Sequence, residues 1–177
     1  RVAFPILTEY QNDNNAIKNT FKKLSSAIAF VTAPIMLIMI LIARPAIVFL
    51  YSDKWLPSVH YFQILCIAGI AVCLQNISYQ AVASKGKSKD LFVWTIIKRI
   101  IGIVIIVLGM LLWEMDGLIW GVTIAAWFLL GTNLYLVSKH INYSLIQQLR
   151  DIFPILTLAI FVFIVTYCIN TIMPFGI

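Results

Sequence analysis

Two adjacent basic residues inside a long apolar run are the strongest candidates for chemistry in this sequence. Lys98 and Arg99 fall within the run from Leu91 to Trp113, where an ionisable side chain is costly and marks a functional site by default. An arginine holds an anionic group such as a diphosphate through two parallel hydrogen bonds, and a lysine attracts it as a point charge. Alternatively, both long side chains reach back to the headgroups at the end of the run. The sequence leaves both interpretations open.

A second group of polar residues lies late in the preceding apolar run. Gln75, Asn76 and Tyr79 lie within about 100° of one another around a helix axis. Either they line a hydrated pathway and contact hydroxyl groups of a ligand, or they form interhelical hydrogen bonds worth about 0.6–2 kcal/mol each. Thr132 and Asn133 in a later run pose the same choice with less support. We therefore expect Lys98, Arg99, Gln75, Asn76 and Tyr79 to be the binding residues of a cavity.

The sequence lacks the residue sets that make or break bonds. His60 and His140 lie far apart, and no acidic residue falls inside an apolar run, so no carboxylate pair is placed for acid–base catalysis. Neither a metal-ligand cluster nor a phosphate-binding loop is visible. Cys66 and Cys73 lie about 10 Å apart on one expected helix, too far for a disulfide. We expect no enzymatic activity, no metal and no cofactor.

Five long apolar runs must position the candidate residues. Each run has about 20 residues, the length that a helix needs to cross roughly 30 Å of hydrocarbon. Apolar residues make up 62% of the 177 residues and charged residues only 11%, against about 45–50% and 25% in soluble domains. The sequence therefore predicts an all-α, polytopic membrane helix bundle with five transmembrane helices, at residues 25–43, 59–83, 91–113, 117–138 and 153–173.

The basic residues predict which side of the membrane each loop occupies. Eleven of the thirteen Lys and Arg residues lie in, or just beyond, every second loop, and the other two are Arg44 and Lys54. The positive-inside rule therefore places loops 1–24, 84–90 and 139–152 in the cytoplasm. The net charge of +6 flanks the apolar runs and forms no single stripe, so we expect no nucleic-acid partner.

The same pattern divides the chain into four parts. Residues 1–24 form a cytoplasmic loop with an amphipathic helix along the membrane surface, and residues 25–138 form four transmembrane helices. Residues 139–152 form another cytoplasmic loop, and residues 153–177 form an additional transmembrane helix and a tail. The chain starts without a methionine and stops just after a span, so we expect it to be a fragment.

Three segments carry a family resemblance. They are Val2 to Asp13 (VAFPILTEYQND), Leu50 to Val59 (LYSDKWLPSV) and Ala83 to Ser88 (ASKGKS). In order and spacing they resemble segments of bacterial polysaccharide transporters, the lipid-linked oligosaccharide flippases of the multidrug/oligosaccharidyl-lipid/polysaccharide exporter superfamily. One departure is Ser52, which stands at a loop position where this family often has glycine.

The resemblance implies a C-terminal fragment of a protein with two helix bundles around a central cavity. Such proteins move undecaprenyl-diphosphate-linked oligosaccharides across the bacterial inner membrane, for O-antigen, capsule or exopolysaccharide synthesis, by alternating access. It also implies the lipid-linked oligosaccharide, membrane lipids and the polysaccharide polymerase machinery as partners. The cavity would need cationic and amide groups, for which Lys98, Arg99, Gln75 and Asn76 are available.

Three alternatives remain open at the level of sequence, of which one is a purely structural membrane subunit. A cation-coupled multidrug exporter of the same superfamily would need an acidic residue inside the membrane, and none lies in these runs. A membrane enzyme of envelope polysaccharide synthesis would need large outer loops with catalytic Arg or His residues. The outer loops expected here are short.

Overall fold

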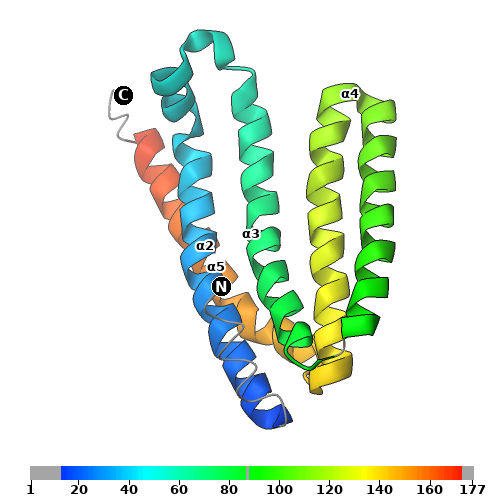
Figure 1. Cartoon of the computed structure of the whole chain (residues 1–177). Helices are drawn as coiled ribbons and strands as arrows, with labels where there is room; N and C mark the ends of the chain where they lie inside the picture. The colour runs from blue at the N-terminus through cyan, green and yellow to red at the C-terminus, as the bar shows by residue number, and fades with distance from the viewer. Residues whose placement is uncertain (1–12, 87, 173–177) are drawn as a thin grey trace.

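The chain folds as a bundle of long helices. The computed structural model describes residues 13–86 and 88–172; for residues 88–90 and 167–172 it describes the backbone alone. In this part of the chain all regular structure is helical (Figure 1), which confirms the all-α membrane bundle. The elements are α2 (Asn14–Tyr51), the short 3-10 helix η1 (Asp53–Trp55), α3 (Ser58–Ala83), α4 (Ser88–Ile141) and α5 (Leu145–Ile172).

The number of long helices differs from the prediction. Four helices of the described chain, not five, are long and apolar enough to cross a membrane. The third and fourth expected spans are the two arms of α4, because the turn between them is so short that no loop separates them. At this turn Trp113 (φ −138°, ψ 26°) and Glu114 (φ 51°, ψ −124°) leave the helical conformation. Figure 1 shows that α4 turns back here, so that its two arms run side by side in opposite directions.

Glycine residues bring the two arms of α4 together near their turn. A Cβ atom placed on Gly117 would lie 2.6 Å from the carbonyl carbon of Gly109, and one placed on Gly121 would lie 3.0 Å from the Cα atom of Ile106. The two backbones are therefore in direct contact. Small residues at four-residue spacing permit such close approach between membrane helices.

Helix α2 starts at a side-chain cap. The Asp13 carboxylate accepts hydrogen bonds from the backbone N–H groups of Asn15 (2.8 Å) and Ala16 (3.1 Å), which satisfies two of the unpaired donors at the start of α2. Residues 1–12, which carry most of the first family-like segment, lie outside the described residues.

In the described residues 13–24, the structure does not contain the separate surface helix that was expected there. The segment from Asn14 onward is instead the first part of α2, which continues without interruption to Tyr51. The physical reason is packing, because Ile17 and Phe21 are completely or almost completely buried. Phe21 packs edge-on against the ring of Tyr143, with ring centroids 6.0 Å apart. A helix lying flat on the membrane would lose these contacts.

Helix α3 lies in the middle of the bundle, between α2 and α4, and α5 packs along α2 (Figure 1). Small buried side chains make the close contacts, including Ala33 of α2 and Ala71 of α3, both fully buried. One polar bond adds to them, since the Gln63 side chain of α3 donates to the backbone carbonyl of Ile40 in α2 at 3.1 Å. Interhelical bonds of this kind stabilise membrane bundles modestly.

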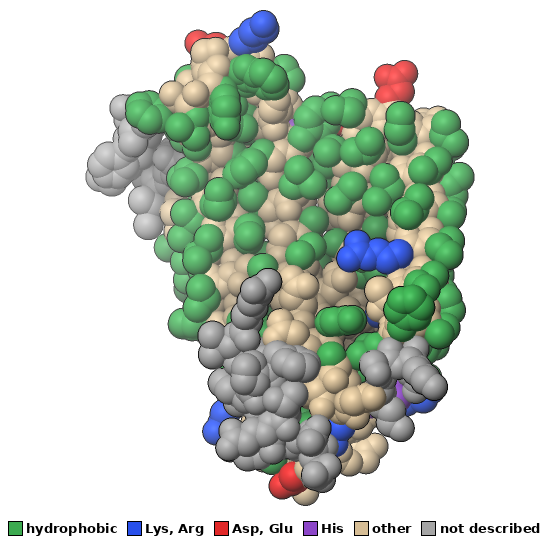
Figure 2. Space-filling view, in the orientation of Figure 1, with side chains coloured by type: hydrophobic (Ala, Val, Ile, Leu, Met, Phe, Trp, Pro, Cys, Tyr) green, Lys and Arg blue, Asp and Glu red, His purple; other side chains and the backbone are tan. Residues whose placement is uncertain are grey.

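The surface has the character of a multi-pass membrane protein. In Figure 2 hydrophobic side chains cover most of the face between the two ends of the bundle, and most charged groups lie near the ends. Leu111 is 75% exposed and Phe161 is 66% exposed, although both are large apolar residues. Exposed apolar surface on this scale is unfavourable in water and favourable against lipid. Figure 2 also shows one basic group well away from either end.

Candidate functional site

The five residues expected to bind a ligand line one cavity of about 310 Å³ between α3 and α4. Helix α3 contributes Gln75, Asn76 and Tyr79, and the first arm of α4 contributes Lys98 and Arg99. The structure thus brings together residues that the sequence places on two different helices. Their role in binding a substrate stays a prediction. The remaining lining residues are Thr95 of the first arm and Leu129 and Asn133 of the second arm.

The cavity lies well inside the apolar part of the bundle. Gln75 and Asn133 each lie eight residues before the end of their helix, and Lys98 lies ten residues after the start of α4. All three helix ends meet at the same end of the bundle (Figure 1). At about 1.5 Å of rise per residue, the polar groups lie roughly 12–15 Å from those ends. Measured from the ends of the apolar runs, at residues 83, 91 and 138, the same groups lie about 8–12 Å inside a hydrocarbon layer of roughly 30 Å.

Lys98 is held by a partner on the other arm of α4. Its side chain is only 4% exposed, and its ammonium group donates a hydrogen bond to the Asn133 side-chain oxygen. The Asn133 amide in turn donates to the backbone carbonyl of Gln75 on α3, at 3.5 Å. The Lys98 side chain therefore does not reach back to the headgroups, which was one of its two possible interpretations. It joins both arms of α4 to α3.

Arg99 is placed differently although it is the next residue. Its side chain is exposed and lines the cavity, because successive residues of a helix point about 100° apart. Within the described part of the chain its guanidinium group forms no hydrogen bond or ion pair with another residue. Arg99 is thus the cation in this cavity that can bind an added anion.

Thr95 adds a second unoccupied polar group. Its hydroxyl oxygen is buried and has no hydrogen-bond partner among the described residues. Buried polar atoms are rarely left unpaired in proteins. A hydroxyl in this position, lining the same cavity as Arg99, can bond to a water molecule or to a ligand.

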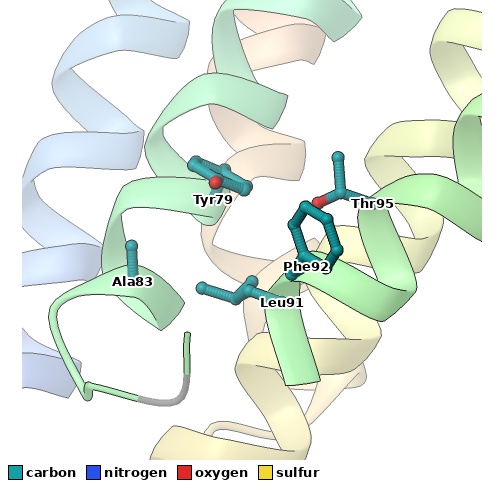
Figure 3. Close-up of a pocket in the computed structure, with 5 residues that line it drawn as sticks. All are labelled: Tyr79, Ala83, Leu91, Phe92 and Thr95. Atoms are coloured by element: carbon teal, nitrogen blue, oxygen red, sulfur yellow. The ribbon is translucent and has the colours of Figure 1, made fainter. Parts of the chain in front are cut away.

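A smaller cavity of about 210 Å³ lies beside this one, nearer the end of the bundle. Figure 3 shows Tyr79 of α3 facing Phe92 and Thr95 of α4, with Leu91 pointing towards Ala83. Tyr79 and Thr95 line both cavities. Since Ala83 is the last residue of α3, the smaller cavity leads from the polar cavity towards the turn between α3 and α4.

Sequence reasoning missed Thr95 and Leu129 and gave Asn133 only a minor place. A signal for Thr95 was available, because residues three and four positions apart lie on the same side of a helix, and Lys98 and Arg99 follow at those spacings. The importance of Asn133 depends on the folding back of α4, which places it beside a residue 35 positions away.

Comparisons with known proteins agree with the family resemblance over part of the chain. Residues 1–60 match a family described as polysaccharide biosynthesis protein. The chain is 29% identical over 94 residues to the teichuronic acid biosynthesis protein TuaB of Bacillus subtilis. This matched segment covers 53% of this chain and 20% of that protein. It is 32% identical over 87 residues to an uncharacterized membrane protein in the cps region of Klebsiella pneumoniae, covering 49% of this chain and 18% of that protein.

A third relative is the lipopolysaccharide biosynthesis protein WzxC of Escherichia coli. It is 24% identical over 109 residues, covering 62% of this chain and 22% of that protein. The matched part of this chain thus spans about a fifth of the length of each relative. No solved structure matches the chain.

Proposed function

We propose that this chain, a relative of polysaccharide biosynthesis proteins whose motifs resemble those of polysaccharide transporters, takes part in moving lipid-linked oligosaccharides across a bacterial inner membrane. The transported unit is an oligosaccharide on a polyprenyl diphosphate, used for surface polysaccharide synthesis. The movement is transport without chemical change, and no bond of the substrate is made or broken. After crossing, the unit is available to the polymerase machinery.

The observation that carries this proposal is the polar cavity with Arg99 deep inside an otherwise apolar bundle. Hydrogen bonds between helices account for Lys98 and Asn133, but they give no role to the Arg99 guanidinium, which is costly among apolar residues. It suits a substrate whose head carries a diphosphate and sugar hydroxyls. Arg99 supplies bidentate hydrogen bonds to the phosphate oxygens. Gln75 and Asn76 supply amide donors and acceptors to the hydroxyls.

The size of the cavity supports a substrate pathway that two helix bundles form together. Ligand pockets hold about 300–1,000 Å³, so a cavity of about 310 Å³ accommodates the diphosphate or one sugar but not a whole oligosaccharide. The rest of the pathway would come from a second helix bundle, in the arrangement that the family resemblance implies. The lipid tail remains against the exposed apolar surface of the helices while the head crosses.

The charge pattern supports an orientation for this movement. The connections at residues 84–86 and 142–144 lie at the end of the bundle where most of the described basic residues lie. The positive-inside rule assigns this end to the cytoplasm. The smaller cavity at Tyr79 then opens a path from the cytoplasmic side to the polar cavity. Substrate enters at this side and leaves at the other.

The proposal is tested by replacing the cavity cation in the natural gene. Arg99→Gln is expected to abolish or strongly reduce surface polysaccharide at unchanged protein level, because the diphosphate loses its bidentate partner. Arg44→Gln is the matched control, since it removes the same group from an exposed position outside the cavity. Lys98→Gln, alone and combined with Arg99→Gln, separates the buried cation from the exposed one. Normal polysaccharide in the double variant would refute the proposed site.

A further inference from the structure

A second cavity, unrelated to the polar cavity, lies at the end of the bundle assigned to the cytoplasm. It has a volume of about 350 Å³ and lies where the start of α2, the connection at residues 142–144 and the start of α5 meet. It shares no residue with the cavity between α3 and α4. Its lining is rich in charged and amide groups: Lys18, Asn19, Lys22, Tyr143, Gln147, Arg150 and Asp151. We call it the basic cavity.

The base of the basic cavity is built around a buried tyrosine. Tyr143 is 2% exposed, and its hydroxyl donates a hydrogen bond to the Asp151 carboxylate. The same carboxylate forms an ion pair of 2.8 Å with Lys22. Burial, and then the bond to Asp151, raise the pKa of Tyr143, so the phenol stays a neutral donor. These contacts fix the positions of the polar groups before any ligand binds.

The charges of the basic cavity are unbalanced. Three cationic residues, Lys18, Lys22 and Arg150, face a single carboxylate, that of Asp151. Lys18 donates to the Gln147 side-chain oxygen at 3.0 Å and lies 5.1 Å from the centre of the Tyr143 ring. Neither of these partners carries a charge, so the charge of Lys18 is not neutralised by them. The cavity therefore attracts anions.

An apolar surface lies beside the basic cavity on α5. Ile146 is 76% exposed, Leu149 is 59% exposed and Phe153 is 67% exposed. Their spacing of three and four residues places them along one side of the helix, next to Arg150. A ligand that fits both features has an anionic head and apolar chains. Basic pockets between helices on the cytoplasmic side of membrane proteins recognise lipid headgroups in this way.

We propose that the basic cavity is a specific site for the phosphate headgroup of an anionic phospholipid, whose acyl chains lie on Ile146, Leu149 and Phe153. The phosphate binds Lys18 and Arg150, while Lys22 remains paired with Asp151. Such a lipid joins the start of α2 to the start of α5 at the membrane surface. The site does not depend on the transported substrate.

The test compares variants of the chain in lipid vesicles of phosphatidylcholine with a small fraction of phosphatidylglycerol. Binding of phosphatidylglycerol is measured by native mass spectrometry after the protein has been released from the vesicles. The variant Lys18→Gln with Arg150→Gln is expected to bind at least about tenfold more weakly, because the phosphate loses its charge-assisted hydrogen bonds to both residues. The control Lys23→Gln with Lys139→Gln removes the same charge from exposed positions outside the cavity and is expected to change binding little.

Three further results would distinguish a specific lipid site from other kinds of anion binding. Equal weakening in the two double variants would overturn the proposal, because it would show diffuse attraction to the surface. Binding of inorganic phosphate as tight as that of phosphatidylglycerol would also overturn it, since the acyl chains would then contribute nothing. The variant Lys18→Arg with Arg150→Lys keeps both charges and is expected to retain binding. Loss of binding in this variant, with its helix content unchanged, would contradict a site built on charge.

Discussion

The close contact between the arms of α4 makes the substitution Gly117→Ala a sharp test of the fold. The new methyl carbon would lie 2.6 Å from the carbonyl carbon of Gly109 and 3.0 Å from the Cβ atom of Trp113. Ordinary van der Waals contact begins at 3.4 Å, so the arms must separate by at least about 0.8 Å. The nearest obstructing atoms, those of the Gly109 carbonyl group, belong to the backbone and cannot rotate away.

The expected change in the free energy of unfolding is the balance of two opposing effects. Overpacking of this kind costs about 1–3 kcal/mol, whereas the change from glycine to alanine inside a helix stabilises it by about 1 kcal/mol. Gly131→Ala is the matched control in the second arm, since a Cβ atom there meets nothing within 4 Å. The Gly131→Ala protein therefore gains only the roughly 1 kcal/mol by which alanine stabilises a helix relative to glycine. The free energy of unfolding of the Gly117→Ala protein is therefore expected to be about 1–3 kcal/mol lower than that of the Gly131→Ala protein.

Titration with sodium dodecyl sulfate in mixed micelles, followed by circular dichroism, measures this difference. Comparison of the two variants removes errors common to both, such as the extrapolation to zero denaturant. Equal free energies of unfolding would refute the reasoning, because they would mean that the two arms do not touch at Gly117. The same separation would move Lys98 away from Asn133, so loss of polysaccharide is a secondary expectation.

Three other substitutions test separate features. Ser52 has φ 79° and ψ 169°, a region open essentially to glycine alone, so Ser52→Gly is expected to raise the free energy of unfolding by about 1 kcal/mol in the same titration. Asn133→Leu leaves the buried Lys98 ammonium without its acceptor and is expected to lower that free energy by about 2–3 kcal/mol, much of which Lys98→Met restores in the double variant. Ser52→Cys and Ser144→Cys, in a background without the native cysteines, are expected to react with impermeant maleimide from opposite sides of the membrane, since both residues are exposed at opposite ends of the bundle.

Each of these has an outcome that contradicts it. A Ser52→Gly protein no more stable than the original would show that the turn before η1 is unstrained. Additive effects of the Asn133 and Lys98 substitutions would mean that the two side chains do not interact. Labelling of both introduced cysteines from one side would overturn the topology.

The sequence by itself determined the helical membrane bundle and the residues worth testing. Long apolar runs can satisfy their backbone groups in lipid only as helices, so composition and run length were enough. The grouping of Gln75, Asn76 and Tyr79 was also local, because the period of a helix places residues three and four positions apart on one side. The same holds for the exceptional position of Lys98 and Arg99, which depends only on their distance from the ends of the run.

Only the tertiary structure decided how these residues are used. Lys98 is buried and bound to Asn133, while Arg99 faces the cavity, and this division depends on how the first arm of α4 is rotated against its neighbours. The start of α2 also became part of a spanning helix, because Phe21 packs against Tyr143, more than a hundred residues later in the chain. Contacts between residues so far apart depend on how whole helices pack. No local pattern of apolar and polar residues specifies that packing.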